Sequence, residues 1–277
     1  MTAYARPEVL VESHWLFGHL HDPDVRVVEA DVAPAAYDSG HIPGAVFWDV
    51  YATVLRPDLR VPADPAAVAA LLARSGIANE TTVVVYSGHP AIAPWVFWFL
   101  KLFGHADVRV LQGGRKKWER EGRLLTTEQP AITPARYTAS PPDPRLRAVR
   151  GAVQDAIGAP HRVLVDVRTP QEYRGEWFMR KPPEGKERAG HLPGAVHIYY
   201  EEAVDEDGSF KPAGELQALY RGKGVTPDKE AITYCAIGIR SAHTWFVLTY
   251  LLGYADVRSY DGSWNEWGNL PDTPVER

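Results

Sequence analysis

The only cysteine of this 277-residue chain lies in a segment that suits nucleophilic chemistry. Cys235 follows a short apolar run, 231–234, that is typical of a buried strand, and a helical pattern begins a few residues later. The start of a helix points free backbone N–H groups at an anion, and its positive end favours a thiolate. We therefore predict that Cys235 is a nucleophile and that the next residues cradle a negatively charged covalent intermediate. The predicted cradle consists of Ala236, Ile237, Gly238, Ile239, Arg240 and Ser241.

Two residues give this loop its character. Gly238 lets the backbone curl tightly, and Arg240 adds a fixed positive charge. A lone cysteine outside such a context is more often an inert, buried side chain. With one cysteine the chain forms neither an intramolecular disulfide nor a multi-cysteine metal site. We expect no metal and no organic cofactor.

The elements that must position Cys235 occur twice in the chain. The block Gly-His-Ile-Pro-Gly-Ala-Val at 40–46 returns as Gly-His-Leu-Pro-Gly-Ala-Val at 190–196, and a second pair of similar blocks follows at 103–109 and 252–258. A shift of about 150 residues in both pairs, with the order kept, indicates duplication of a whole domain. The segment 130–144 is rich in Pro, Ala, Ser and Thr and is typical of a linker. The predicted domains are 1–140 and 145–277.

Short apolar runs alternate with helical patterns in each copy. This alternation predicts a parallel sheet covered by helices on both faces, and therefore an α/β fold. The predicted strands are 25–29, 82–86, 161–167 and 231–234, and the predicted helices are 66–74, 94–103, 215–220 and 242–252.

The first copy carries a different residue at the position of the cysteine. Tyr86 matches Tyr234, and Ser87 stands in place of Cys235. A serine without an adjacent base is a poor nucleophile. We predict that the N-terminal copy is catalytically silent.

These motifs together resemble the tandem-domain rhodanese family, which comprises thiosulfate and 3-mercaptopyruvate sulfurtransferases. The resemblance depends on the two repeated blocks, the Cys235 loop, and the segments 166–168 with Tyr173 and 261–264; the stretch 241–248 is similar to the bacterial thiosulfate branch. It implies two rhodanese-like domains, each a five-stranded parallel sheet with helices on both faces. It also implies transfer of a sulfane sulfur through a Cys235 persulfide to cyanide or a thiol. The partners would then be a small-molecule sulfur donor and a thiophilic acceptor.

Three departures from the family patterns bear on the sulfur donor. Ala236 and Ile237 stand where many thiosulfate-using relatives have basic residues, and the loop lacks the Cys-Gly-[Ser/Thr]-Gly-Val-Thr pattern of mercaptopyruvate enzymes. Glu172 replaces the arginine with which those enzymes bind their substrate, and its charge would repel a carboxylate. The balance favours thiosulfate, with 3-mercaptopyruvate as the alternative.

Further polar residues accompany the loop. Among the basic residues of the insertion 174–188, the resemblance makes Arg188 a candidate for donor binding beside Arg240. It places Asp166 near the cysteine loop, where this residue either orients the loop or has a structural role as a helix N-cap or partner of Arg168. Glu172 follows Arg168 by four residues, and this spacing predicts an ion pair between them. His41 and His191 belong to turn blocks present in both copies and are expected to be structural.

Two other classes of protein compete with this interpretation. Cysteine-loop phosphatases and arsenate reductases have five residues between cysteine and arginine, whereas four separate Cys235 from Arg240. A sulfur-relay binding module with a protein acceptor stays open.

Composition excludes further partners. The formal net charge is −5, so we expect no nucleic acid. No apolar run reaches membrane-spanning length, and Glu8 and Glu12 interrupt any signal-peptide core. We expect a cytoplasmic protein without a membrane partner.

Overall fold

The computed structural model describes residues 3–277, which fall into two compact units. The N-terminal unit comprises Pro7–Asp143 and Val204–Phe210, and the C-terminal unit comprises Pro144–Ala203, Lys211–Arg277 and the segment that ends at Arg6. The predicted limits 1–140 and 145–277 stay a prediction, and the units differ from them by two short segments.

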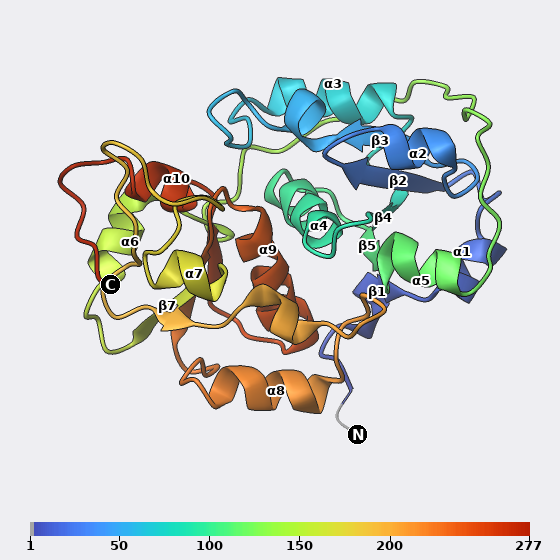
Figure 1. The fold of residues 1–277 in the computed structure, drawn as a ribbon. Coiled ribbons are helices and arrows are strands. Elements are labelled where there is room, and N and C mark those ends of the chain that lie inside the picture. The colour runs from blue at the N-terminus through green and yellow to red at the C-terminus, as the bar shows by residue number, and fades with distance from the viewer. Residues whose placement is uncertain (1–2) are drawn as a thin grey trace. The chain divides into compact units, whose positions relative to one another are not determined.

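The N-terminal unit is a five-stranded parallel sheet with the strand order β1-β5-β4-β2-β3. In Figure 1, α3 lies above β2 and β3, and α4 lies below them. The strands are β1 (Leu10–Val11), β2 (Val25–Asp31), β3 (Val46–Asp49), β4 (Thr82–Tyr86) and β5 (Val108–Leu111). The helices are η1 (Pro7–Val9), α1 (Ser13–Gly18), α2 (Ala35–Ser39), η2 (Val50–Val54), α3 (Pro65–Arg74), α4 (Ile92–Leu102) and α5 (Gly114–Arg120).

The C-terminal unit repeats this topology with the strand order β6-β10-β9-β7-β8, again all parallel. The predicted α/β class with two five-stranded parallel sheets is therefore confirmed. The strands are β6 (Arg147–Ala148), β7 (Arg162–Asp166), β8 (Val196–His197), β9 (Glu230–Tyr234) and β10 (Val257–Tyr260). The helices are α6 (Arg150–Ala156), α7 (Pro170–Tyr173), η3 (Tyr200–Ala203), α8 (Ala213–Arg221), α9 (Ile239–Phe246), η4 (Val247–Leu251) and α10 (Ser263–Trp267).

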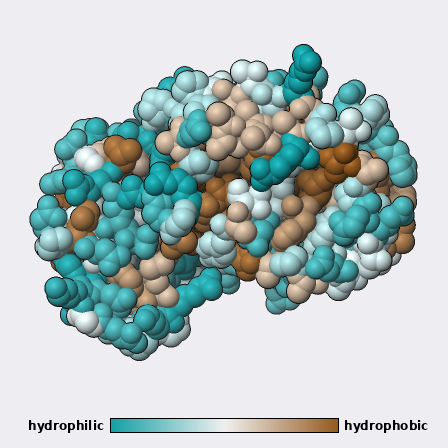
Figure 2. All heavy atoms as spheres, turned by 90° about the horizontal axis from the view of Figure 1, so that it is seen from above, coloured by the Kyte–Doolittle hydropathy of each residue, from teal (hydrophilic) through white to brown (hydrophobic). Residues whose placement is uncertain are grey.

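Apolar side chains explain why these elements form. The central strands β4 and β9 are buried on both faces, and α4 is buried around almost its whole circumference. Asp64 caps α3 by accepting the N–H of Ala66. The first residue of this helix is a proline, which is tolerated there because that position needs no backbone donor. Most of the face seen in Figure 2 is hydrophilic, with apolar residues in patches. Among residues 3–277, no helix has the length and apolarity needed to cross a membrane.

The two histidine blocks form the same turn in both units. His41 Nδ1 contacts the carbonyl oxygen of Tyr37 at 2.9 Å, and His191 Nδ1 contacts that of Tyr173 at 2.8 Å. Each histidine ring stacks on its tyrosine with 3.8 Å between ring centroids. These contacts agree with the structural role expected for both histidines.

Candidate active site

Cys235 lies where the central strand β9 ends and the loop into α9 begins. Its side chain is fully buried, and its Sγ accepts a hydrogen bond from the N–H of Gly238 at 3.2 Å. Gly238 has a φ of +91°, and a Cβ there would lie 2.8 Å from the Cα of Asp261. Glycine is therefore required for the curl that brings this N–H to the sulfur.

The remaining residues of the predicted cradle form the loop and the first turn of α9. Ala236, Ile239 and Arg240 are buried, and Ile237 is half-buried. The Ser241 hydroxyl donates to the carbonyl of Gly238 at 2.8 Å and contacts Ser259 Oγ at 3.0 Å. These bonds fix the start of the helix whose positive end faces the loop.

Ser263, at the start of α10, forms a hydrogen bond with the backbone of Cys235. Its Oγ accepts the N–H of Cys235 at 3.0 Å, donates to the carbonyl of Tyr260 at 2.6 Å, and lies 4.0 Å from Sγ. The next residue, Trp264, donates its N–H to the Cys235 carbonyl at 2.9 Å. Ser263 has a φ of +47°, a conformation that costs a non-glycine residue about 1–2 kcal/mol. Strain of this kind concentrates at functional sites.

The sequence identified Ser263 as part of a motif but did not predict its hydrogen bond to the Cys235 backbone. A comparison of the two copies contains the missing signal. Gly114 takes the equivalent position in the N-terminal unit, with a φ of +55°. Glycine would adopt the conformation of residue 263 without strain, as it does in the N-terminal unit. The serine at this position therefore indicates that its side chain has a function.

Arg240 forms a buried, two-pronged ion pair with Glu172 of α7. Its Nη1 and Nη2 donate to the two carboxylate oxygens at 2.8 and 2.9 Å, and the side chains are 9% and 0% exposed. Burial alone would raise the pKa of Glu172, but the hydrogen bonds and charge of Arg240 lower it to about 2. Burial likewise works to lower the pKa of Arg240, yet the bonds from Glu172 and the charge of the Cys235 thiolate raise it. Arg240 is thus a cation in the first turn of α9, directly after the loop that Cys235 begins.

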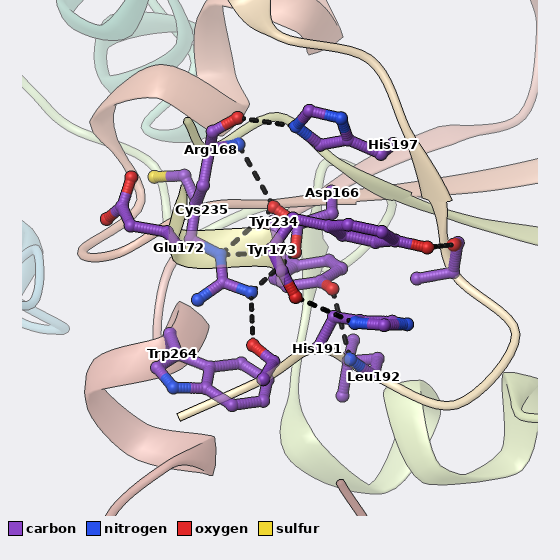
Figure 3. A network of polar contacts seen from close by, with 12 residues as sticks. Asp166, Arg168, Glu172, Tyr173, His191, Leu192, His197, Tyr234, Cys235 and Trp264 are labelled. Atoms are coloured by element: carbon purple, nitrogen blue, oxygen red, sulfur yellow. Dashed lines mark hydrogen bonds and ion pairs between the residues drawn. The ribbon is translucent and has the colours of Figure 1, made fainter. Parts of the chain in front are cut away.

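The predicted pair between Arg168 and Glu172 is wrong. Arg168 precedes α7, which begins at Pro170, so a spacing of four residues does not place the two side chains on one helix face. Arg168 instead pairs with Asp166 at 2.5 Å. Figure 3 shows Glu172 and Cys235 extending to one side of the Asp166–Arg168 pair.

The pair of Asp166 and Arg168 supports the strand end that carries the cysteine. Asp166 stands opposite Tyr234 in the parallel ladder, directly before Cys235. Arg168 is fully buried, donates to the carbonyl of Gly190 at 2.7 Å, and lies 4.4 Å from the ring centroid of Trp264. The predicted pairing of Asp166 with Arg168 is therefore observed, and a role of Asp166 in orienting the loop stays a prediction.

Arg188 contacts the C-terminal segment of the chain. Its guanidinium donates to the carbonyls of Leu270 and Thr273 and, at 3.0 Å, to the hydroxyl of Thr273. Its role in donor binding stays a prediction, and a donor would have to compete with these bonds. Elsewhere in the insertion, Arg174 and Lys181 form exposed pairs with Glu176 and Glu184.

The corresponding loop of the N-terminal unit has the opposite electrostatics. Ser87 follows β4, and its hydroxyl and the N–H of Gly88 contact Oδ2 of Asp31 at 3.5 and 3.3 Å. Asp31 lies two residues beyond Glu29, which faces Tyr86 as Asp166 faces Tyr234. A carboxylate thus takes the place of Arg168.

A strand-end thiol that accepts a backbone N–H at the start of a helix, with a guanidinium in the same loop, is typical of a protein that carries a group on cysteine sulfur. The model of the rhodanese-like domain matches residues 12–121 and 150–270, so the chain belongs to the rhodanese family as a tandem-domain sulfurtransferase.

Several relatives resemble the chain along nearly its whole length. It is 49% identical to the sulfur carrier protein TtuD of Thermus thermophilus, over 99% of this chain and 98% of that protein. It is 44% identical to a "putative thiosulfate sulfurtransferase" of Mycobacterium tuberculosis, over 98% and 99%. Among solved structures it resembles the anaerobic ergothioneine biosynthesis enzyme of Chlorobium limicola with trimethyl histidine, with a TM-score of 0.88, 27% identity, and coverage of 100% and 72%. EanB with a cysteine persulfide and ergothioneine gives a TM-score of 0.87, 27% identity, and coverage of 100% and 72%.

Replacing Ser263 by glycine should slow sulfur transfer without loss of the fold. Glycine adopts the positive φ freely, but the hydrogen bond to the Cys235 amide is lost, which costs about three- to tenfold in rate. Thiocyanate formation measures the rate, and circular dichroism measures the melting temperature. Ser75→Ala, which removes a buried hydroxyl bonded to Trp48, is the control. A Ser263→Gly variant as fast as wild type would contradict the role of this hydroxyl.

The pair of Glu172 and Arg240 should make stability depend on acid. The pKa of Glu172 is lowered from 4.5 to about 2, so its contribution is complete above about pH 4.5 and is lost as the pH falls toward 2. That contribution is on the order of 3 kcal/mol. The free energy of unfolding in urea should differ most between wild type and Glu172→Gln at neutral pH, and the difference should shrink at about pH 3. A difference independent of pH would refute this assignment.

Proposed function

We propose that this sulfurtransferase moves a sulfane sulfur from thiosulfate, through a persulfide on Cys235, to cyanide or a thiol. The observation that carries the proposal is the position of Cys235, whose buried Sγ receives the Gly238 N–H at the start of α9. Backbone N–H groups aimed at a sulfur stabilise a negative charge there without reorganisation.

The proposed reaction is a double displacement. The Cys235 thiolate attacks the outer sulfur of thiosulfate, a bond forms between the two sulfurs, and the bond to the inner sulfur breaks. Sulfite leaves with that electron pair, and the negative charge passes to the outer persulfide sulfur. Cyanide or a thiolate then attacks this sulfur, takes it away, and restores the Cys235 thiolate.

The residues around Cys235 have separate roles in this scheme. The N–H groups of residues 236–241 cradle the persulfide, Arg240 offsets its negative charge, and Ser263 holds the cysteine backbone. Asp166 acts on the Cys235 loop indirectly, because it pairs with Arg168 and so positions that arginine at the end of β9. No step requires a metal or an organic cofactor.

The choice of donor depends on the charge near the loop. Glu172 is a buried carboxylate paired with Arg240 and offers no cation to the carboxylate of 3-mercaptopyruvate, which remains the alternative. The similarity to mycobacterial proteins named for thiosulfate supports the same choice. Initial rates with the two donors under identical conditions decide between them.

A second function, delivery of the sulfur to another protein, is favoured by one comparison. The chain is 49% identical to TtuD, which is named as a sulfur carrier protein. The same Cys235 persulfide serves both functions, and only the acceptor differs.

Replacing Cys235 by serine should abolish transfer and leave the fold intact. A hydroxyl fits the space of the thiol, but its alkoxide is not accessible at neutral pH, so cyanide-dependent thiocyanate formation should fall at least about a thousandfold. After treatment with thiosulfate, mass spectrometry should show one added sulfur atom on wild type and none on the variant. Activity within tenfold of wild type would remove Cys235 from the mechanism.

Moving the cysteine to the other copy should not restore activity. In the double variant Cys235→Ser with Ser87→Cys, the new thiol would lie beside the Asp31 carboxylate, which disfavours a thiolate. Pro90 also removes one N–H from the loop. We expect the same thiocyanate rate as for Cys235→Ser alone; turnover near the wild-type rate would show that the N-terminal copy lacks only a thiol.

A further inference from the structure

Three buried or largely buried ion pairs adjoin the cysteine loop, and each is electrically balanced. Arg240 pairs with Glu172, Arg168 pairs with Asp166, and Arg147 pairs with Asp261 at 2.7 Å. Asp261 lies against the loop at Gly238. Arg168 lies over the ring of Trp264, and the backbone N–H of Trp264 donates to the Cys235 carbonyl. Each guanidinium of these three pairs is therefore matched by a carboxylate, although thiosulfate is a dianion.

Glu172 is held more firmly than its pairing with Arg240 requires. Besides Nη1 of Arg240, its Oε2 accepts the N–H and the hydroxyl of Thr169, both at 3.0 Å. The backbone N–H of Glu172 returns a bond to the Thr169 hydroxyl at 3.3 Å, which completes a capping box. The carboxylate is fixed at the start of α7, and it fixes the guanidinium in turn.

We propose that Glu172 determines donor specificity by charge: it cancels the charge of Arg240 beside Cys235 and so disfavours dianionic sulfur donors relative to monoanionic ones. This inference rests on the proposed function. The depressed pKa of Glu172 supports it, since the carboxylate stays ionised throughout the neutral range.

The physical reason is that Coulomb energy scales with donor charge. A negative charge near the thiolate repels a dianion twice as strongly as a monoanion at the same distance. It also changes the reactivity of the thiolate itself, but that effect is common to all donors. The ratio of rates for two donors therefore isolates the effect of charge on the donor.

Thiosulfate and methanethiosulfonate form a suitable pair of donors. Each gives its outer sulfur to the Cys235 thiolate and forms the same persulfide. Thiosulfate releases sulfite with the electron pair of the broken bond, and methanethiosulfonate releases methanesulfinate in the same way. The donors differ by one unit of charge.

The experiment measures kcat/KM for both donors, with cyanide as acceptor, in wild type and in variants of the pair. In Glu172→Gln the ratio of thiosulfate to methanethiosulfonate should rise on the order of tenfold. In Glu172→Asp, which keeps the charge, the ratio should stay near wild type even where both rates fall. Glu176→Gln removes an equal charge four residues away, from an exposed pair with Arg174, and should leave the ratio within about twofold.

Variants of Arg240 keep the test decisive if Glu172→Gln does not fold. Arg240→Gln alone should lower the ratio, and the double variant with Glu172→Gln, which removes one charge of each sign, should restore it. A ratio that does not follow the local charge in this order overturns the inference, as does an unchanged ratio in Glu172→Gln. Failure of wild type to use either donor would instead refute the proposed function.

Discussion

The two-pronged bond between Arg240 and Glu172 is the interaction on which the cysteine loop depends. It joins the first turn of α9 to the start of α7, although the two residues are 68 positions apart in sequence. Burying two charges is costly, and the cost is recovered only where the hydrogen bonds are as complete as they are here. Removing either partner would leave the other charge buried, so the pair acts as a constraint that holds the loop in one conformation rather than as a simple source of stability.

A second pair shows how the duplicated scaffold was altered while its geometry was kept. In the N-terminal unit Glu29 pairs with Arg115 of α5 at 2.9 Å, and Arg115 also donates to the Gly40 carbonyl at 2.5 Å. In the C-terminal unit Arg168 makes the equivalent bonds to Asp166 and to the Gly190 carbonyl, while Trp264 takes the place of Arg115. The arginine thus comes from the end of β7 instead of the helix. This exchange brings a positive charge to the strand end that precedes Cys235.

Sequence patterns were sufficient for elements with long apolar runs and insufficient for contacts between distant residues. The predicted strands 25–29 and 82–86 match β2 and β4 closely because buried parallel strands are continuous apolar runs. The edge strands β1, β6 and β8 are two residues long and have no period to detect. The Glu172–Arg240 pair could not be predicted, since local spacing favoured Arg168 and only the tertiary fold brings α7 to the loop.

The two copies differ in the surroundings of Cys235 and Ser87 as much as in these two residues themselves. Where the C-terminal unit has Arg168, the N-terminal unit has Asp31, whose carboxylate takes up the N–H of Gly88. Where one has the strained Ser263, the other has Gly114, which adopts the same φ region without cost. An N–H that is bonded to a carboxylate is not available to a sulfur anion. In the C-terminal unit Glu172, Asp166 and Asp261 are instead paired with arginines, and the N–H of Gly238 bonds to the sulfur.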